Sequence, residues 1–184
     1  MVPGKYLSGL QAEPFAGCSG VFAIADPRRP RSWRYVASYA DGKRHKPHIF
    51  ALLKRYGQPE VRGAWDWHHV VEGQHFADVD FTGELERLYR EVLPCVLLHK
   101  DEHIAYNQLL HTGATDELFR DALPDDLLER SRRAAAEAGD RSKHPVLRQR
   151  VQRLRALYWN AYTGDPVLQR IAVNVLDDVL ARLP

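Results

Sequence analysis

The sequence predicts an α+β fold, with strands in the first half of the chain and helices in the second. Short runs of β-branched and aromatic residues, separated by turn residues, dominate up to residue 99. Beyond that point apolar residues recur three and four positions apart, which is helical spacing. The chain of 184 residues is 45% hydrophobic and 27% charged, as expected of a globular protein. We expect three regions, residues 1–60, 61–113 and 114–184, packed as one globule because no flexible linker separates them.

The first region predicts a β-hairpin followed by a helix. Two segments rich in β-branched and aromatic residues flank a stretch with two prolines and several arginines, which is turn chemistry. A helix should end near Gly57, because glycine and a following proline stop helices. The expected elements are strands at 20–25 and 33–39, a turn at Asp41-Gly42 and a helix at 47–56.

The second region predicts the order strand, connection, strand, helix. The run from Leu93 to Leu98 is continuously apolar and short, which is typical of a buried strand. Pro94 stands near its start, where the missing N–H is tolerated. The expected elements are a strand at 65–71, a helix at 83–92, a strand at 93–98 and a helix at 101–110.

The third region predicts helices only. Thr115 precedes acidic residues, which suits a helix N-terminus. An apolar stripe with arginines on its other side runs through the segment after Pro145. We expect one helix that begins at Thr115 and further helices at 124–139, 145–162 and 167–183, with a break at 163–166.

Net charge and cysteine content exclude several classes of protein. A net charge of only +2 excludes a uniformly basic coat, although Arg28, Arg29 and Arg31 form a local patch that could meet phosphates. Cys18 and Cys95 lie far apart and predict neither a disulfide framework nor a cysteine-based zinc site. We expect neither a membrane span nor a signal peptide, because no stretch is apolar over about 18 residues and the first residues lack a charged start and an apolar core. We therefore expect a cytoplasmic protein by default, with secretion as a toxin left open.

Histidines are concentrated in the second region. Six of the nine histidines of the chain are His68, His69, His75, His99, His103 and His111. Scattered surface histidines would not cluster in this way, so the segment predicts a metal-centred unit.

The motif Trp67-His68-His69-Val70-Val71-Glu72, with Leu93-Pro94 and the later His103 and Asn107, resembles the HNH endonucleases of the ββα-metal, or His-Me finger, superfamily. The resemblance covers about a quarter of the chain. It implies a central ββα-metal finger between an N-terminal hairpin with its helix and a helical C-terminal region. It also implies a metal-dependent endonuclease that hydrolyses phosphodiester bonds in DNA.

Phosphodiester hydrolysis needs a base, a cation and a rigid frame. Histidine titrates near neutral pH, so a neutral imidazole can accept the proton of water. The resemblance assigns this role to His69 and makes His68 and His103 metal ligands. Asn107, one helical turn after His103, could add an oxygen ligand. Glu72 would brace the histidines rather than bind the metal.

The expected cofactor is a divalent metal ion, Mg, Mn, Zn or Ni, because a mixed nitrogen and oxygen ligand set accepts each of them. The expected partner is nucleic acid, in the form of DNA. The oligomeric state is open.

Two alternatives stay open. The family usually has an asparagine ahead of the second strand, and none lies between His69 and His103. The unit could therefore be a catalytically inactive finger-like module that binds nucleic acid or protein. Alternatively, His68, His103 and a further histidine such as His75 could hold a structural zinc ion, in which case chelation would unfold the chain. A strand also turns adjacent side chains to opposite faces, so His68 and His69 converge only if the strand is distorted or ends there.

Overall fold

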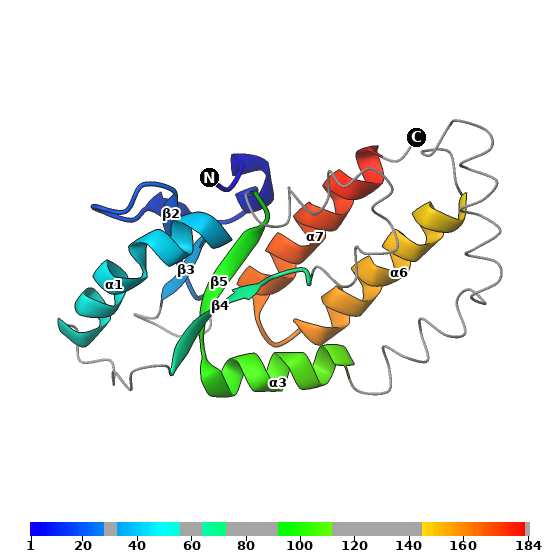
Figure 1. Ribbon diagram of the computed structural model, residues 1–184. Coiled ribbons are helices and arrows are strands. Elements are labelled where there is room, and N and C mark those ends of the chain that lie inside the picture. The colour runs from blue at the N-terminus through cyan, green and yellow to red at the C-terminus, as the bar shows by residue number, and fades with distance from the viewer. Residues whose placement is uncertain (28–32, 56–63, 73–91, 112–144, 183–184) are drawn as a thin grey trace.

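The computed structural model describes residues 1–27, 33–55, 64–72, 92–111 and 145–182. They confirm the α+β class: one antiparallel five-stranded sheet, in the order β1-β2-β3-β5-β4, has helices on both faces (Figure 1). The strands are β1 (Ala12–Pro14), β2 (Val21–Ala25), β3 (Trp33–Ser38), β4 (Trp65–His69) and β5 (Pro94–His99). The helices are η1 (Gly4–Leu7), α1 (Tyr39–Arg55), α3 (Lys100–His111), α6 (Pro145–Ala161) and α7 (Pro166–Arg182). The helices expected at 83–92, from Thr115 and at 124–139 lie outside the described residues.

The predicted hairpin is confirmed. Strands β2 and β3 pair antiparallel with Phe22 opposite Val36, and β1 adds a short strand on the other side of β2. Because β3 then pairs with β5, the sheet continues from the first region into the second.

Helix α1 begins at Tyr39 and not at the predicted residue 47, and the expected turn at Asp41-Gly42 is wrong because both residues lie inside the helix. The hydroxyl of Ser38 accepts the N–H of Asp41 at 3.2 Å and donates to the Asp41 carboxylate at 2.8 Å. A serine with an acidic residue three positions later is a capping pattern, and here it starts the helix. Gly42 gives room for close packing against Trp67 rather than a turn.

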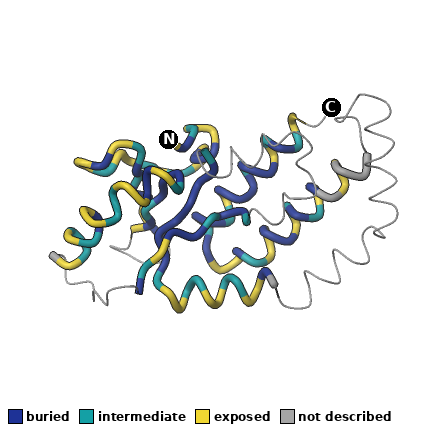
Figure 2. The backbone as a smooth tube through the Cα atoms, in the orientation of Figure 1, coloured by how far each residue is buried: buried dark blue, intermediate teal, exposed yellow. Residues whose placement is uncertain are grey.

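Strands β4 and β5 pair antiparallel, with His68 opposite Val96, and α3 follows β5 directly. The expected strand–strand–helix order is therefore present in the described residues of the second region. Strand β5 is buried along almost its whole length between β3 and β4 (Figure 2). Strand β5 is therefore an interior strand of the sheet, and β4 is the edge strand beside it.

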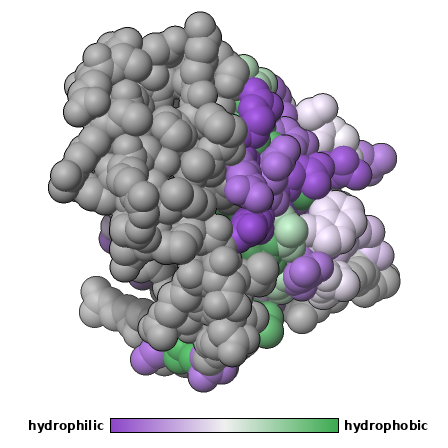
Figure 3. Space-filling model, turned by 90° about the vertical axis from the view of Figure 1, so that its right-hand side faces the viewer, coloured by the Kyte–Doolittle hydropathy of each residue, from purple (hydrophilic) through white to green (hydrophobic). Residues whose placement is uncertain are grey.

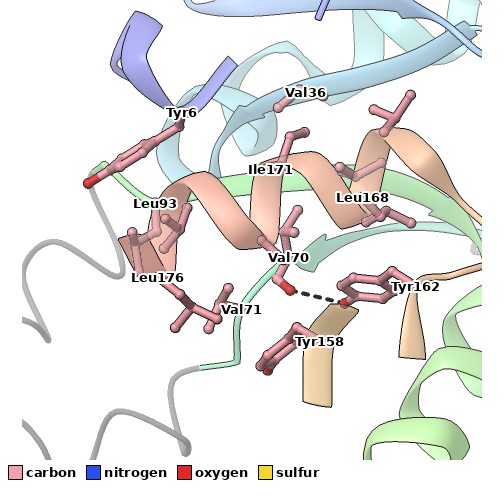
Figure 4. Packing of buried hydrophobic residues seen from close by; sticks show 14 of the residues in the cluster. Tyr6, Val36, Val70, Val71, Leu93, Tyr158, Tyr162, Leu168, Ile171 and Leu176 are labelled. Carbon is pink, nitrogen blue, oxygen red and sulfur yellow. Dashed lines mark hydrogen bonds between the residues drawn. The ribbon is translucent and has the colours of Figure 1, made fainter. Parts of the chain in front are cut away.

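The two faces of the sheet bury different clusters. Cys95 and Leu97 of β5 pack with Trp67 and Ile49 on the α1 side. On the other face, buried apolar residues of β2, β3 and β5 pack with η1, α6 and α7 (Figure 4). The alternation of β5 side chains thus separates two cores. Each burial of a large apolar side chain in them contributes roughly 1.5–3 kcal/mol.

The last two helices, α6 and α7, confirm the predicted pair with a break between them. The Asp165 carboxylate accepts the backbone N–H groups of Val167 and Leu168, both at 3.1 Å, and Pro166 takes the first helical position. This is a full N-terminal cap for α7. None of the described helices has the length and apolar character that crossing a membrane requires. In the view of Figure 3, hydrophilic side chains predominate among the described atoms, with smaller hydrophobic areas between them.

Candidate functional site

The structure brings His68 and His103 together. His68 lies on β4 and His103 near the start of α3, and their ring centroids are 4.8 Å apart with 63° between the ring planes. Only 2% of His68 is exposed, whereas His103 is partly exposed. Two imidazoles in contact, one of them open to solvent, provide a pair of nitrogen donors at the junction of strand and helix.

Two tyrosines enclose His68. The hydroxyl of Tyr162, which follows α6, lies 3.0 Å from His68 Nε2. Tyr106 of α3 stacks on the His68 ring, with ring centroids 6.4 Å apart. Tyr106 also packs edge-on against Tyr162, with ring centroids 5.1 Å apart. Aromatic contacts on two sides restrict the rotation of the imidazole. The site therefore includes a residue from the C-terminal region.

His69 lies on the opposite face of the sheet. Its ring stacks on Tyr39 of α1, with centroids 5.1 Å apart and 21° between the planes. Lys43 Nζ lies 5.2 Å from the centroid of the same tyrosine ring. The strand ends at His69, but His69 still pairs with Cys95, so the alternation of side chains holds through it. The proposed base and the proposed ligands are therefore not brought together in this structure.

Two further predicted site residues, Asn107 and Glu72, lie on α3 and just after β4. Asn107 lies one turn after His103 on α3, and its Oδ1 is buried without a hydrogen-bond partner among the described residues. A buried oxygen in this state fits a metal ligand, since leaving it unsatisfied is costly. Glu72 lies three residues after the end of β4, and its backbone N–H donates to the Tyr158 hydroxyl at 2.8 Å.

A buried group of charges lies beside the histidine pair. Arg34 of β3 makes two hydrogen bonds to Glu102, at 2.9 and 3.0 Å, and one to Asp165 at 2.7 Å. Burial alone would lower the pKa of Arg34, but its bonds to Glu102 and the charge of Asp165 raise it. The Tyr106 hydroxyl donates to the same Asp165 oxygen at 3.3 Å. Burial and the nearby Asp165 raise the pKa of Tyr106, so its hydroxyl stays protonated.

The described residues contain no group of three or more histidine, cysteine, aspartate or glutamate side chains placed to hold a metal ion. His75, suggested as a third zinc ligand, and the predicted phosphate contacts Arg28, Arg29 and Arg31 lie outside the described residues. Of the predicted ligands, the described residues bring His68 and His103 into ring contact and place Asn107 one turn after His103 on α3.

Sequence reasoning missed three residues of this site. Tyr106 follows His103 by three positions, which is the same helix face, so it was predictable from spacing. Asp165 precedes a proline at a helix start, which is a capping signal. Tyr162 carries no local signal, because only the fold of the whole chain brings it to β4.

Comparisons of this chain with protein-family models, with curated proteins and with solved structures found no match.

Proposed function

We propose that this protein is a metal-dependent endonuclease of the HNH type that hydrolyses phosphodiester bonds in DNA. The contact between His68 and His103 is the observation that supports the proposal most, with ring centroids 4.8 Å apart. These two residues are distant in sequence and were paired from the motif alone. A histidine from an antiparallel strand pair and one from the following helix are the donors that the resemblance requires.

His68, His103 and Asn107 are the residues that would hold the ion. The two imidazoles lie in contact, and the buried Asn107 Oδ1 lacks a hydrogen-bond partner among the described residues. When bound there, a divalent cation would stabilise the negative charge on the phosphoryl and leaving oxygens.

His69 keeps the proposed role of general base, with one geometric requirement. Its ring now stacks on Tyr39, on the face of the sheet opposite to His68. To accept a proton from water at the His68–His103 site, the ring has to leave Tyr39 as the end of β4 rearranges. Substrate binding is the event we propose for that rearrangement.

The exposed side of α1 supports a nucleic-acid partner. Lys43 and Lys54 are exposed on this helix, and Arg44 is also exposed but forms an ion pair at 3.4 Å with Asp41, the one acidic residue of the helix. Exposed cations along a helix attract phosphate groups even when the net charge of the protein is small. The face lies on the same side of the sheet as His69.

Nicking of supercoiled plasmid DNA, with Mg²⁺, Mn²⁺, Ni²⁺ or Zn²⁺ added separately, tests the proposal. We expect cleavage by the wild type in at least one ion and none in EDTA. His68→Ala and His103→Ala should abolish it, and His69→Ala should lower the rate by roughly 100-fold or more, the contribution of a general base. Asp177→Asn, which changes an exposed residue of α7 away from the histidines and from α1, is the control and should cleave normally.

Wild-type protein that cleaves no DNA with any of the four ions would contradict the proposed activity. If His69→Ala alone cleaved normally, the two-histidine site would stand and the base would be another residue.

An inactive binding module is the second candidate, and the position of His69 favours it. A base stacked on Tyr39, on the face away from His68, is the arrangement expected of a finger that has lost turnover. This candidate predicts that the protein binds DNA in EDTA and does not cleave it when metal is added.

A further inference from the structure

Tyr162 connects the candidate site to the C-terminal helices. It is fully buried, and its hydroxyl donates to the backbone carbonyl of Val70 at 3.0 Å, the bond drawn as a dashed line in Figure 4. The same hydroxyl lies 3.0 Å from His68 Nε2. Val70 follows directly after β4, so one side chain contacts both the end of the strand and its histidine.

Counting protons assigns the direction of the second bond. A tyrosine hydroxyl has one proton, and a carbonyl oxygen can only accept. Since Tyr162 gives its proton to Val70, its oxygen has to accept a proton from His68. His68 therefore carries its proton on Nε2, and in the neutral ring Nδ1 is the acceptor nitrogen.

We propose that Tyr162 is a positioning residue for the metal site: it holds His68 in the Nε2–H tautomer, so that His68 presents Nδ1 to a divalent cation. The inference rests on the proposed function, because it assumes a cation at His68 and His103. It adds to that function which nitrogen of His68 binds the cation, and it names Tyr162 as the residue that determines this choice. A hydrogen bond on the other ring nitrogen is the usual means of fixing a metal-binding histidine.

Ring contacts support the same role. Tyr106 lies nearly parallel to the His68 ring, with 23° between the planes, and meets Tyr162 at 83°. The imidazole is therefore restrained in its plane by Tyr106 and in its rotation by the bond to Tyr162. The ring cannot exchange its two nitrogens without breaking that bond.

Long-range ¹H–¹⁵N NMR of the metal-free protein at one fixed pH measures the tautomer directly. The signals of His68 are assigned by comparison with His68→Gln. We expect Nε2 to carry the proton and Nδ1 to show the shift of an unprotonated nitrogen. In Tyr162→Phe, which loses only the hydroxyl, the signals should move toward a mixture of the two tautomers. Tyr6→Phe, in which another buried tyrosine loses its hydroxyl, is the matched control and should leave them unchanged.

Calorimetric titration with Mn²⁺ and with Zn²⁺ measures the consequence for the metal. Tyr162→Phe should bind the ion about 10- to 100-fold more weakly than the wild type, the usual effect of losing a group that orients a ligand. Tyr6→Phe should bind as tightly as the wild type. In the loaded wild-type protein, Nδ1 of His68 is the nitrogen whose NMR signal should shift.

The two proposals fail in different ways. A wild-type His68 with its proton on Nδ1, or protonated on both nitrogens, overturns the inference without any variant having to fold. A tautomer unchanged in Tyr162→Phe, or an unchanged affinity for metal in that variant, also overturns it while the proposed function stands. Absence of any metal binding by the wild type overturns both.

Discussion

Arg34 and Asp165, which are 131 positions apart, form a buried ion pair with Nη2 of the arginine 2.7 Å from Oδ2 of the aspartate. Both side chains are more than nine-tenths buried. Asp165 also caps α7 through its other oxygen, and Arg34 also holds Glu102 of α3. One pair of residues therefore ties the N-terminal hairpin to two helices that follow it.

Replacing Asp165 should separate its two functions. Asp165→Asn can still cap α7 but leaves Arg34 with one carboxylate fewer, and a broken buried pair costs about 3–5 kcal/mol of unfolding free energy. Asp165→Ala also loses the cap, which should cost roughly 1 kcal/mol more. Urea unfolding measures both variants. Asp177→Asn breaks the exposed pair with Arg155 and should cost less than about 1 kcal/mol. Equal stability of Asp165→Asn and wild type would show that the pair contributes little.

Gly42→Ala should destabilise the protein, although alanine is the better helix former by roughly 1 kcal/mol. A Cβ at this position would lie 2.6 Å from the Trp67 indole, so β4 and α1 would have to separate. Overpacking of this kind costs about 1–3 kcal/mol and should outweigh the helix preference. Gly4→Ala meets nothing within 4 Å and serves as the control. Thermal unfolding of the two variants decides the sign; a Gly42→Ala protein as stable as the control would contradict the packing.

Acid should weaken the contact between the N-terminus and α7. Burial would raise the pKa of Asp178, but hydrogen bonds from Lys5 and Tyr6 and the charge of Arg182 hold it below its ordinary value. A carboxyl group with a lowered folded pKa stabilises the protein at any pH above its unfolded pKa of about 3.9. That stabilisation disappears as the pH falls through the folded pKa.

Asp178→Asn should therefore be less stable than the wild type at pH 7, and the difference should shrink as the pH falls below about 4. Urea unfolding at a series of pH values measures it. Asp41 and Asp66 also have lowered pKa values, so the variant should keep part of the acid sensitivity. A difference that stays constant with pH would contradict the assignment to Asp178.

The basic face of α1 should determine how salt affects DNA binding. Each lysine that contacts a phosphate adds about 0.9 to the slope of log affinity against log salt concentration. A variant with Lys43→Gln and Lys54→Gln should lower the slope by roughly 2, as measured in EDTA to prevent cleavage. The control removes two cations from α7 instead, by Arg170→Gln and Arg182→Gln, and should keep the slope. Identical slopes in both variants would place the DNA elsewhere.

Local patterns predicted most of the described elements. The hairpin, the apolar strand β5 and the last two helices follow from residue type and spacing, and the structure confirms them. The start of α1 was missed because Asp41-Gly42 was interpreted as a turn. The competing signal, Ser38 with Asp41 three positions later, was present in the sequence and is the cap that the structure contains.

The site was predictable in part. The motif predicted that His68 and His103 lie together, and their rings are in contact. This was possible because each residue belongs to a pattern that is visible locally: His68 to a strand, and His103 to the helix that follows an apolar strand. The separation of His69 from His68 follows from the alternation of a regular strand. Tyr162 and Arg34 were beyond reach, since their contacts depend on how the sheet and the C-terminal helices pack, which no local pattern encodes.

The place of β5 between β3 and β4 has a consequence during protein synthesis. Its two neighbours come from earlier in the chain, and Tyr162, which bonds to His68 of β4, comes from much later. A growing chain on the ribosome cannot complete the histidine pair until β5 and α3 have emerged, and cannot set the tautomer of His68 until α6 has followed. In a chain that stops before α6, the proposed metal site would lack Tyr162 and should bind its ion more weakly.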